Sequence, residues 1–229
     1  MARKRMISNG KCSLCGGVFD KAAMTSHLKS CVRKRDASAT SAGERGVKPA
    51  PVFHLSVEGR FLPEYWMHLE VPAGAPLDAL DRFLRDTWLE CCGHMSEFQI
   101  GDTRYSVEPI DCDDRDMGVK LKDVLSPGMK FHHAYDFGST THLTLKVVAQ
   151  REREIKNRQI TVLARNEPPV IPCGRCGAPA TRICAECAYS EQGWLCEKCA
   201  RDHECGEDMF LPVVNSPRVG VCGYTGPDA

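Results

Sequence analysis

The chain has 229 residues, of which 42% are hydrophobic and 26% charged, and its 30 basic and 30 acidic side chains give a formal net charge of zero. This composition allows one mid-sized core with small appendages, and no run approaches the roughly 20 apolar residues of a membrane-spanning helix. The basic N-terminus lacks an apolar signal stretch, so we expect a soluble cytoplasmic protein whose fourteen cysteines are kept reduced.

The first motif along the chain is a small zinc finger. Cys12 and Cys15 are separated by two residues, His27 follows after eleven more, and Cys31 lies four residues beyond it. The last two ligands fall at i and i+4, on one face of a helix predicted over residues 21–32. The motif predicts a ββα-type finger that binds one zinc ion through Cys12, Cys15, His27 and Cys31.

The region around this finger is strongly basic. Residues 1–36 hold nine Lys or Arg residues and two acids, a local net charge of +7. Such an asymmetry favours an anionic partner, DNA or RNA, held through sequence-independent phosphate contacts. The candidate contacts are Arg3, Lys4, Arg5, Arg33, Lys34 and Arg35. A solubilising role for these charges is the alternative, as is docking of the finger to a protein.

Residues 36–51 are small, polar and rich in helix breakers, which predicts a flexible linker between an N-terminal unit, residues 1–35, and a central domain, residues 52–165. In that domain, alternating apolar residues predict strands from residue 52 and over residues 65–71. An amphipathic helix is predicted after Pro76, with Leu77, Leu80, Leu84 and Trp88 on its apolar face. Further strands are expected at residues 97–106, 130–136, 142–150 and 160–164.

A set of short motifs marks the central domain: Leu77-Asp78-Ala79-Leu80 with Trp88, His94-Met95-Ser96-Glu97-Phe98, the glycine and tyrosine of residues 101–105, Lys122-Asp123-Val124-Leu125, Phe131, Tyr135-Asp136-Phe137-Gly138 and His142. In these residues the domain resembles the plasmid-Ri open-reading-frame-three-like family, also labelled insertion-element passenger or TnpR-like. The resemblance implies a compact α+β roll and an association with mobile elements, without an established activity. Residues 139–141 depart from the family pattern.

An alternative class is an enzyme that uses His132, His133, Asp136 and His142 of the central domain. Strand alternation argues against it, because His132 and His133 must point to opposite faces of a strand. The acidic loop over residues 111–116 lacks the spacing of a calcium loop, which favours a solvated loop. Cys91, Cys92 and Cys112 are interpreted as ordinary buried or loop cysteines.

The C-terminal region, residues 166–229, holds three Cys-x-x-Cys pairs and eight candidate ligands in all, too many thiols for chance and too few apolar residues for an independent core. By similarity to RING, B-box and MYND modules, Cys173, Cys176, Cys196 and Cys199 hold one zinc ion, and Cys184, Cys187, His203 and Cys205 hold a second. Sequential pairing of the cysteine pairs and Cys222 in place of Cys205 remain open. Disulfides are the alternative to metal.

Together these patterns predict an α+β protein, with a central mixed-sheet roll and one main helix flanked by two small zinc-stabilised modules. About three zinc ions are expected. The predicted function is that of a zinc-binding interaction protein, with nucleic acid bound by the N-terminal region or a protein bound by the C-terminal module, and without catalysis.

Overall fold

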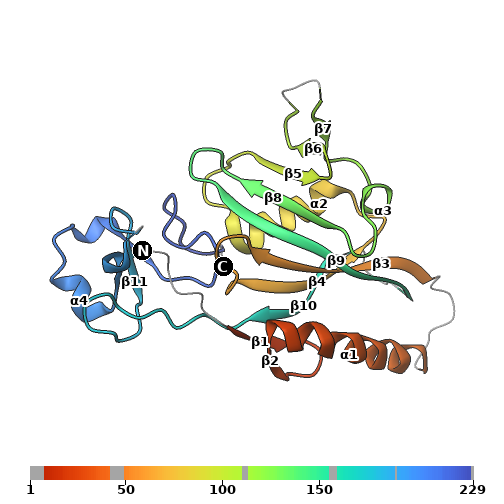
Figure 1. Cartoon of the computed structure of the whole chain (residues 1–229), viewed down its shortest axis with the longest axis horizontal. Coiled ribbons are helices and arrows are strands. Elements are labelled where there is room, and N and C mark those ends of the chain that lie inside the picture. The colour runs from red at the N-terminus through yellow and green to blue at the C-terminus, as the bar shows by residue number, and fades with distance from the viewer. Residues whose placement is uncertain (1–7, 42–48, 110–112, 155–158, 189, 228–229) are drawn as a thin grey trace.

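The computed structural model describes residues 8–41, 49–109, 113–154, 159–188 and 190–227 (Figure 1). The fold is α+β, as predicted. A ten-stranded mixed sheet has the strand order β2-β1-β10-β4-β3-β9-β8-β5-β6-β7, and a separate three-stranded sheet has the order β12-β11-β13. No helix in the described part of the chain is long and apolar enough to cross a membrane.

The centre of the large sheet is a set of long antiparallel strands that follow the predicted alternation. They are β3 (Pro49–Gly59), β4 (Trp66–Pro72), β8 (Lys130–Tyr135), β9 (Thr141–Glu154) and β10 (Thr161–Asn166). β3 pairs with β9 and β4, and β8 pairs with β9, so that Ala134 lies opposite His142. Alternate residues of these strands therefore face an apolar core on one side of the sheet.

Helix α2 (Leu77–Leu84) covers that core and continues as the π-helical turn η1 (Arg85–Leu89). The residues predicted for its apolar face, Leu77, Leu80, Leu84 and Trp88, are all 0% exposed. The short helix α3 (Leu121–Val124) adds Leu121 to the same core. The single strand predicted over residues 97–106 is two strands in the structure, because a turn at Gly101 divides it into β5 (Ser96–Ile100) and β6 (Thr103–Ser106). β6 also pairs in parallel with β7 (Arg115–Asp116).

The N-terminal finger is a hairpin and a helix, as its ββα pattern predicts. β1 (Asn9–Cys12) pairs with β2 (Val18–Asp20), and α1 (Lys21–Ser41) follows. The carboxylate of Asp20 accepts a hydrogen bond from the Ala23 amide at 2.8 Å and so caps the first turn. α1 extends well beyond the predicted residue 32.

The finger joins the central sheet instead of standing apart from it. β1 pairs with β10, placing Gly10 opposite Asn166, and Gly10 comes so near the Trp66 ring that a Cβ would lie 2.4 Å from it. A second apolar cluster spans the junction and consists of Cys12, Met24, Leu28, Val32, Trp66, Leu163 and Ala164. Residues 36–51 therefore differ from the predicted flexible linker: residues 36–41 are helical and residues 49–51 belong to β3. Residues 42–48 lie outside the described part.

The C-terminal region is small and rich in turns, and it lies at the left of Figure 1. Its elements are β11 (Arg182–Cys184), η2 (Glu191–Gly193), β12 (Trp194–Leu195), α4 (Glu197–Arg201), η3 (Glu207–Met209) and β13 (Phe210–Pro212). Beyond β13 the chain returns to the central domain, where Ser216 donates a hydrogen bond to the Trp88 carbonyl at 2.6 Å. The tail is thus part of the central packing.

Candidate metal centres

Four groups of cysteine and histidine side chains, each with four ligand atoms within 4.8 Å of one another, could hold metal ions in the described part of the chain. A tetrahedral zinc site with Zn–S bonds of roughly 2.3 Å places its sulfurs about 3.8 Å apart, and a histidine nitrogen about 3.6 Å from a sulfur. A group whose ligand atoms lie near these separations can hold a zinc ion with little movement.

The first group lies in the finger and contains the four predicted residues, Cys12, Cys15, His27 and Cys31. β1 and the turn after it supply the first two, and one face of α1 supplies the others, as the i, i+4 spacing predicts. The Cys12 and Cys31 sulfurs are 3.9 Å apart, and Cys15 Sγ lies 3.3 Å from His27 Nε2. Phe19 stacks on the His27 ring at 4.4 Å between centroids, which fixes the orientation of that ligand.

The second group contains Cys173, Cys176, Cys196 and Cys199, with the Cys176 and Cys196 sulfurs 3.7 Å apart. Burial raises the pKa of the Cys173 thiol, but the amides of Cys196, Arg175 and Cys176 donate to its sulfur and lower the pKa to about 6. The hydrogen bond from Cys176 raises the pKa of Cys199 to about 12. Crowded thiols of this kind resist losing all their protons unless a cation neutralises them.

The third group contains Cys184, Cys187, His203 and Cys205, with the Cys187 and Cys205 sulfurs 4.0 Å apart. Both ring nitrogens of His203 are buried, and neither has a hydrogen-bond partner among the residues that the structure describes. A metal ion bound to one of these nitrogens would offset the cost of burying it without a hydrogen bond. The grouping follows the interleaved arrangement, and the structure places Cys205, not Cys222, beside these residues.

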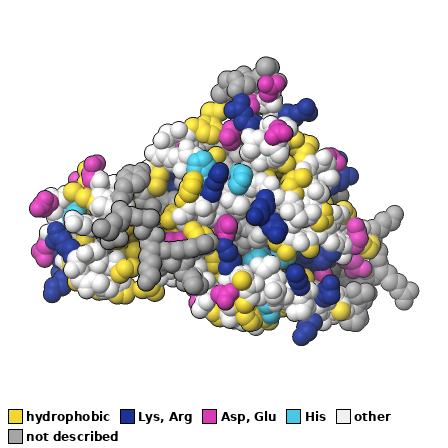
Figure 2. All heavy atoms as spheres, in the orientation of Figure 1, with side chains coloured by type: hydrophobic (Ala, Val, Ile, Leu, Met, Phe, Trp, Pro, Cys, Tyr) yellow, Lys and Arg dark blue, Asp and Glu magenta, His cyan; other side chains and the backbone are white. Residues whose placement is uncertain are grey.

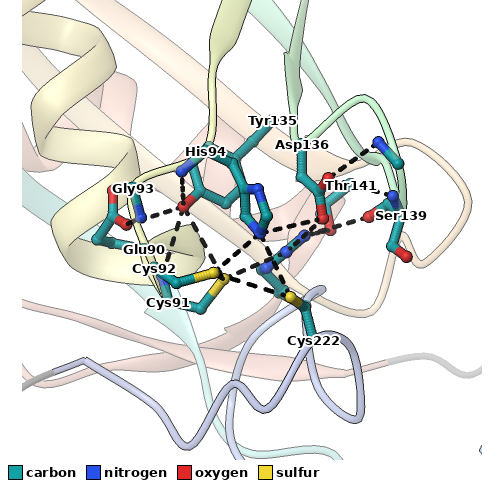
Figure 3. Close-up of polar contacts among 12 residues, drawn as sticks. Glu90, Cys91, Cys92, Gly93, His94, Tyr135, Asp136, Ser139, Thr141 and Cys222 are labelled. Atoms are coloured by element: carbon teal, nitrogen blue, oxygen red, sulfur yellow. Dashed lines mark hydrogen bonds and ion pairs between the residues drawn. The ribbon is translucent and has the colours of Figure 1, made fainter.

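The fourth group was missed by the sequence reasoning. Cys91, Cys92 and His94, in the loop after η1, lie beside Cys222 of the C-terminal tail (Figure 3). The structure thus brings Cys91 and Cys92, interpreted from the sequence as ordinary buried or loop cysteines, into a group that could hold a metal ion, and Cys112 lies outside the described residues. The quartet Cys91-Cys92-Gly93-His94 was a usable signal, but nothing in the spacing links it to a residue 130 positions further on.

The donor sets fit zinc in each group, because four thiolates, or three thiolates with one histidine, are typical zinc ligand sets. Disulfides do not compete in this structure. All thirteen cysteines in its described part are free, and the Sγ–Sγ separations above far exceed the roughly 2.05 Å of a disulfide bond.

The predicted phosphate contacts fall into three sets. Arg33 and Lys34 are exposed on α1, whereas Arg3, Lys4 and Arg5 lie outside the described residues. Arg35 is half-buried and pairs with Glu70 and Asp36, each at 2.8 Å. Its guanidinium is therefore engaged within the fold.

The histidines considered for catalysis are separated by the sheet. His133 is 0% exposed and lies 2.7 Å from the Asp81 carboxylate of α2, on the core face. His132 and His142 lie on the opposite, open face, and Asp136 is bonded to Arg218 at 2.7 Å. Burial lowers the pKa of both His132 and His142. In the described part of the chain, none of these residues belongs to a group of metal ligands.

Comparisons with known proteins add little to this geometry. No family model matches the chain, and no curated protein matches it. Among solved structures, a protein of unknown function from Methanosarcina mazei Go1 matches with 16% sequence identity and a TM-score of 0.46, over 53% of this chain and 72% of the other.

Proposed function

We propose that the chain is a zinc-binding interaction protein, in which the finger and the adjoining open face of the sheet contact nucleic acid. Zinc is the metal that the three predicted ligand sets favour, since thiolates with few histidines select it over magnesium or calcium. The finger packs on the sheet through β1 and α1, so its metal also positions the neighbouring surface.

The observation that carries the nucleic-acid proposal is a cleft of about 270 Å³ between α1 and the open face of the sheet. Lys21, Lys130 and Lys146 line it together with Thr25 and Thr144. Lys21 forms an ion pair with the Glu58 carboxylate, which also lines the cleft, so three positive charges face one negative charge. Figure 2 shows that basic and histidine side chains gather over the sheet on this side.

Lysine ammonium groups and hydroxyls at such a cleft suit phosphate oxygens, which accept hydrogen bonds from both. Arg33 and Lys34 extend the basic surface along α1. The proposed contact is therefore with the phosphate backbone. Binding of this kind is steeply dependent on salt and only weakly dependent on sequence.

The test is a salt titration of binding to a labelled 20-base-pair duplex and to the matching single strand, followed by fluorescence anisotropy. The variant Lys21→Gln/Lys130→Gln/Lys146→Gln removes the three lysines of the cleft, of which Lys21 is paired with Glu58 in the free protein. At about 0.9 per contact, the slope of log K against log salt for the duplex should become shallower by about 1.8 from Lys130 and Lys146, and by about 2.7 where Lys21 leaves Glu58 for a phosphate. A variant with Arg33→Gln and Lys34→Gln should weaken binding further.

The matched control is Lys122→Gln/Lys198→Gln/Arg201→Gln, which removes the same charge from exposed positions outside the cleft. Its slope should remain near the wild-type value. Equal losses in the two triple variants would show that only net charge matters and would refute the cleft. Absence of binding by the wild type at low salt would favour a protein partner, for which the C-terminal module stays the predicted contact.

A further inference from the structure

The group formed by Cys91, Cys92, His94 and Cys222 has the dimensions of a metal site. Cys92 Sγ lies 3.6 Å from Cys91 Sγ and 3.9 Å from Cys222 Sγ, close to the roughly 3.8 Å edge of a tetrahedral zinc–thiolate site. His94 Nε2 lies 3.0 Å from Cys92 Sγ and 3.3 Å from Cys222 Sγ. Figure 3 shows the imidazole directed between these two sulfurs.

Two residues at this group have an unusual, left-handed backbone conformation. Only two non-glycine residues in the described part of the chain have positive φ, Cys222 at 50° and Asp136 at 66°, and both lie here. Such conformations are uncommon for residues with a side chain and persist where the surroundings enforce them. For Cys222, the left-handed turn carries its sulfur to the loop of residues 91–94, which comes from a distant part of the chain.

That loop is held rigidly. The Gly93 amide donates to Glu90 Oε1 at 2.6 Å, and the same carboxylate accepts the Tyr135 hydroxyl at 2.9 Å. The amide of His94 donates to Tyr135 Oη at 3.3 Å, and its ring meets the tyrosine ring edge to face at 5.7 Å. These contacts hold the backbone of the loop and the His94 ring, and they do not involve the tail.

A buried arginine of the tail connects this group to Asp136. Arg218 is 0% exposed and donates to the Asp136 carboxylate at 2.7 Å and to Cys91 Sγ at 3.3 Å. It also donates to Thr141 Oγ1 at 3.1 Å and lies over the Tyr135 ring. A divalent ion with three thiolates and a neutral histidine would carry one net negative charge, and Arg218 donates a charge-assisted hydrogen bond to one of those sulfurs while it also pairs with Asp136.

From these observations we propose that Cys91, Cys92, His94 and Cys222 bind a fourth zinc ion, which fastens the C-terminal tail to the central domain. The ion would close a loop between residues 92 and 222, bringing the turn that bears Arg218 against the end of β8. Three thiolates and one imidazole form a complete tetrahedral set, so the site is a structural clamp and leaves no position for a substrate. This proposal is independent of nucleic-acid binding.

The experiment measures zinc per chain by inductively coupled plasma mass spectrometry, on full-length protein purified under reducing conditions. We expect four ions in the wild type and three in Cys92→Ser/Cys222→Ser. Cys112→Ser is the control, because it removes a thiol that is not one of the proposed ligands, and it should retain four. The variant Cys222→His replaces one zinc ligand by another that tolerates a left-handed backbone, and it should also retain four.

Hydrogen exchange supplies a second readout. The amides of Val219, Val221 and Tyr224 donate within the tail's turns, and their protection should fall at least tenfold in Cys92→Ser/Cys222→Ser while protection in β3 and β9 is retained. Three ions in both proteins would overturn the fourth site and leave the three predicted centres standing. A disulfide among Cys91, Cys92 and Cys222 in the reduced preparation, or a tail equally protected in both proteins, would also overturn the clamp.

Discussion

Leu163 of β10 provides a test of whether the finger and the central domain fold as one unit. Its side chain is 0% exposed, and the residues that cover it belong largely to the finger, including Met24, Leu28 and Val32. Leu163→Ala removes three carbon groups, worth roughly 2.4 kcal/mol at about 0.8 kcal/mol each. The cavity left behind brings the expected loss of stability to about 3 kcal/mol.

For a chain of this length, that loss lowers Tm by roughly 6–12 °C, measured by calorimetry on zinc-loaded protein. Thr161→Ala, at an exposed position of the same strand, should lower stability by less than about 1 kcal/mol. In a Cys15→Ser/His27→Ala background, whose finger is unfolded, Leu163→Ala should also change stability by less than about 1 kcal/mol. An equal loss in both backgrounds would refute the coupling between finger and sheet.

Three further predictions follow from other contacts. Burial lowers the pKa of His54 to about 4 and that of His68 to about 3, so the unfolded chain takes up protons before the folded protein does. The stability present above pH 6.5 should therefore be lost as the pH falls toward 4. In urea titrations, His54→Gln/His68→Gln should flatten this pH dependence relative to the wild type. Glu70→Gln should lower stability by about 1–2 kcal/mol because the half-buried Arg35, Arg151 and Arg153 then keep only Asp36 as an acidic partner among the described residues, whereas exposed Glu152→Gln should change it by less than about 0.5 kcal/mol. A strong chelator should abolish hydrogen-exchange protection in β11 and β13 but not in β3 and β9, because structural zinc contributes roughly 10 kcal/mol to the folding of such modules. Protection of β11 and β13 that survives the chelator would contradict zinc-dependent folding.

Much of the central fold was predictable because it depends on local periodicity. Alternation fixed the faces of β3 and β4, and the spacing of Leu77, Leu80 and Leu84 fixed the buried face of α2. The interleaved grouping of the C-terminal cysteines came from similarity to known zinc modules, and the structure brings those residues together.

What the sequence could not supply are the long-range pairings. β1 adds to the sheet beside β10, more than 150 residues later, and the apolar cluster around Trp66 depends on that pairing. The polar residues 36–41 read as a linker because their composition is poor in apolar side chains, yet they continue α1, where Asp36 forms ion pairs with Arg151 and Arg153. Tertiary contacts outweighed local propensity in both places.

The central claim is that this chain depends on zinc held by cysteine-rich centres, and native mass spectrometry of the full-length protein tests it most directly. The spectrum counts bound ions, and the mass after denaturation reports whether the fourteen cysteines are reduced. We predict at least three zinc ions on a fully reduced chain, and four if the tail clamp is present. A folded protein with one ion or none, or with its C-terminal cysteines joined as disulfides, would contradict the account.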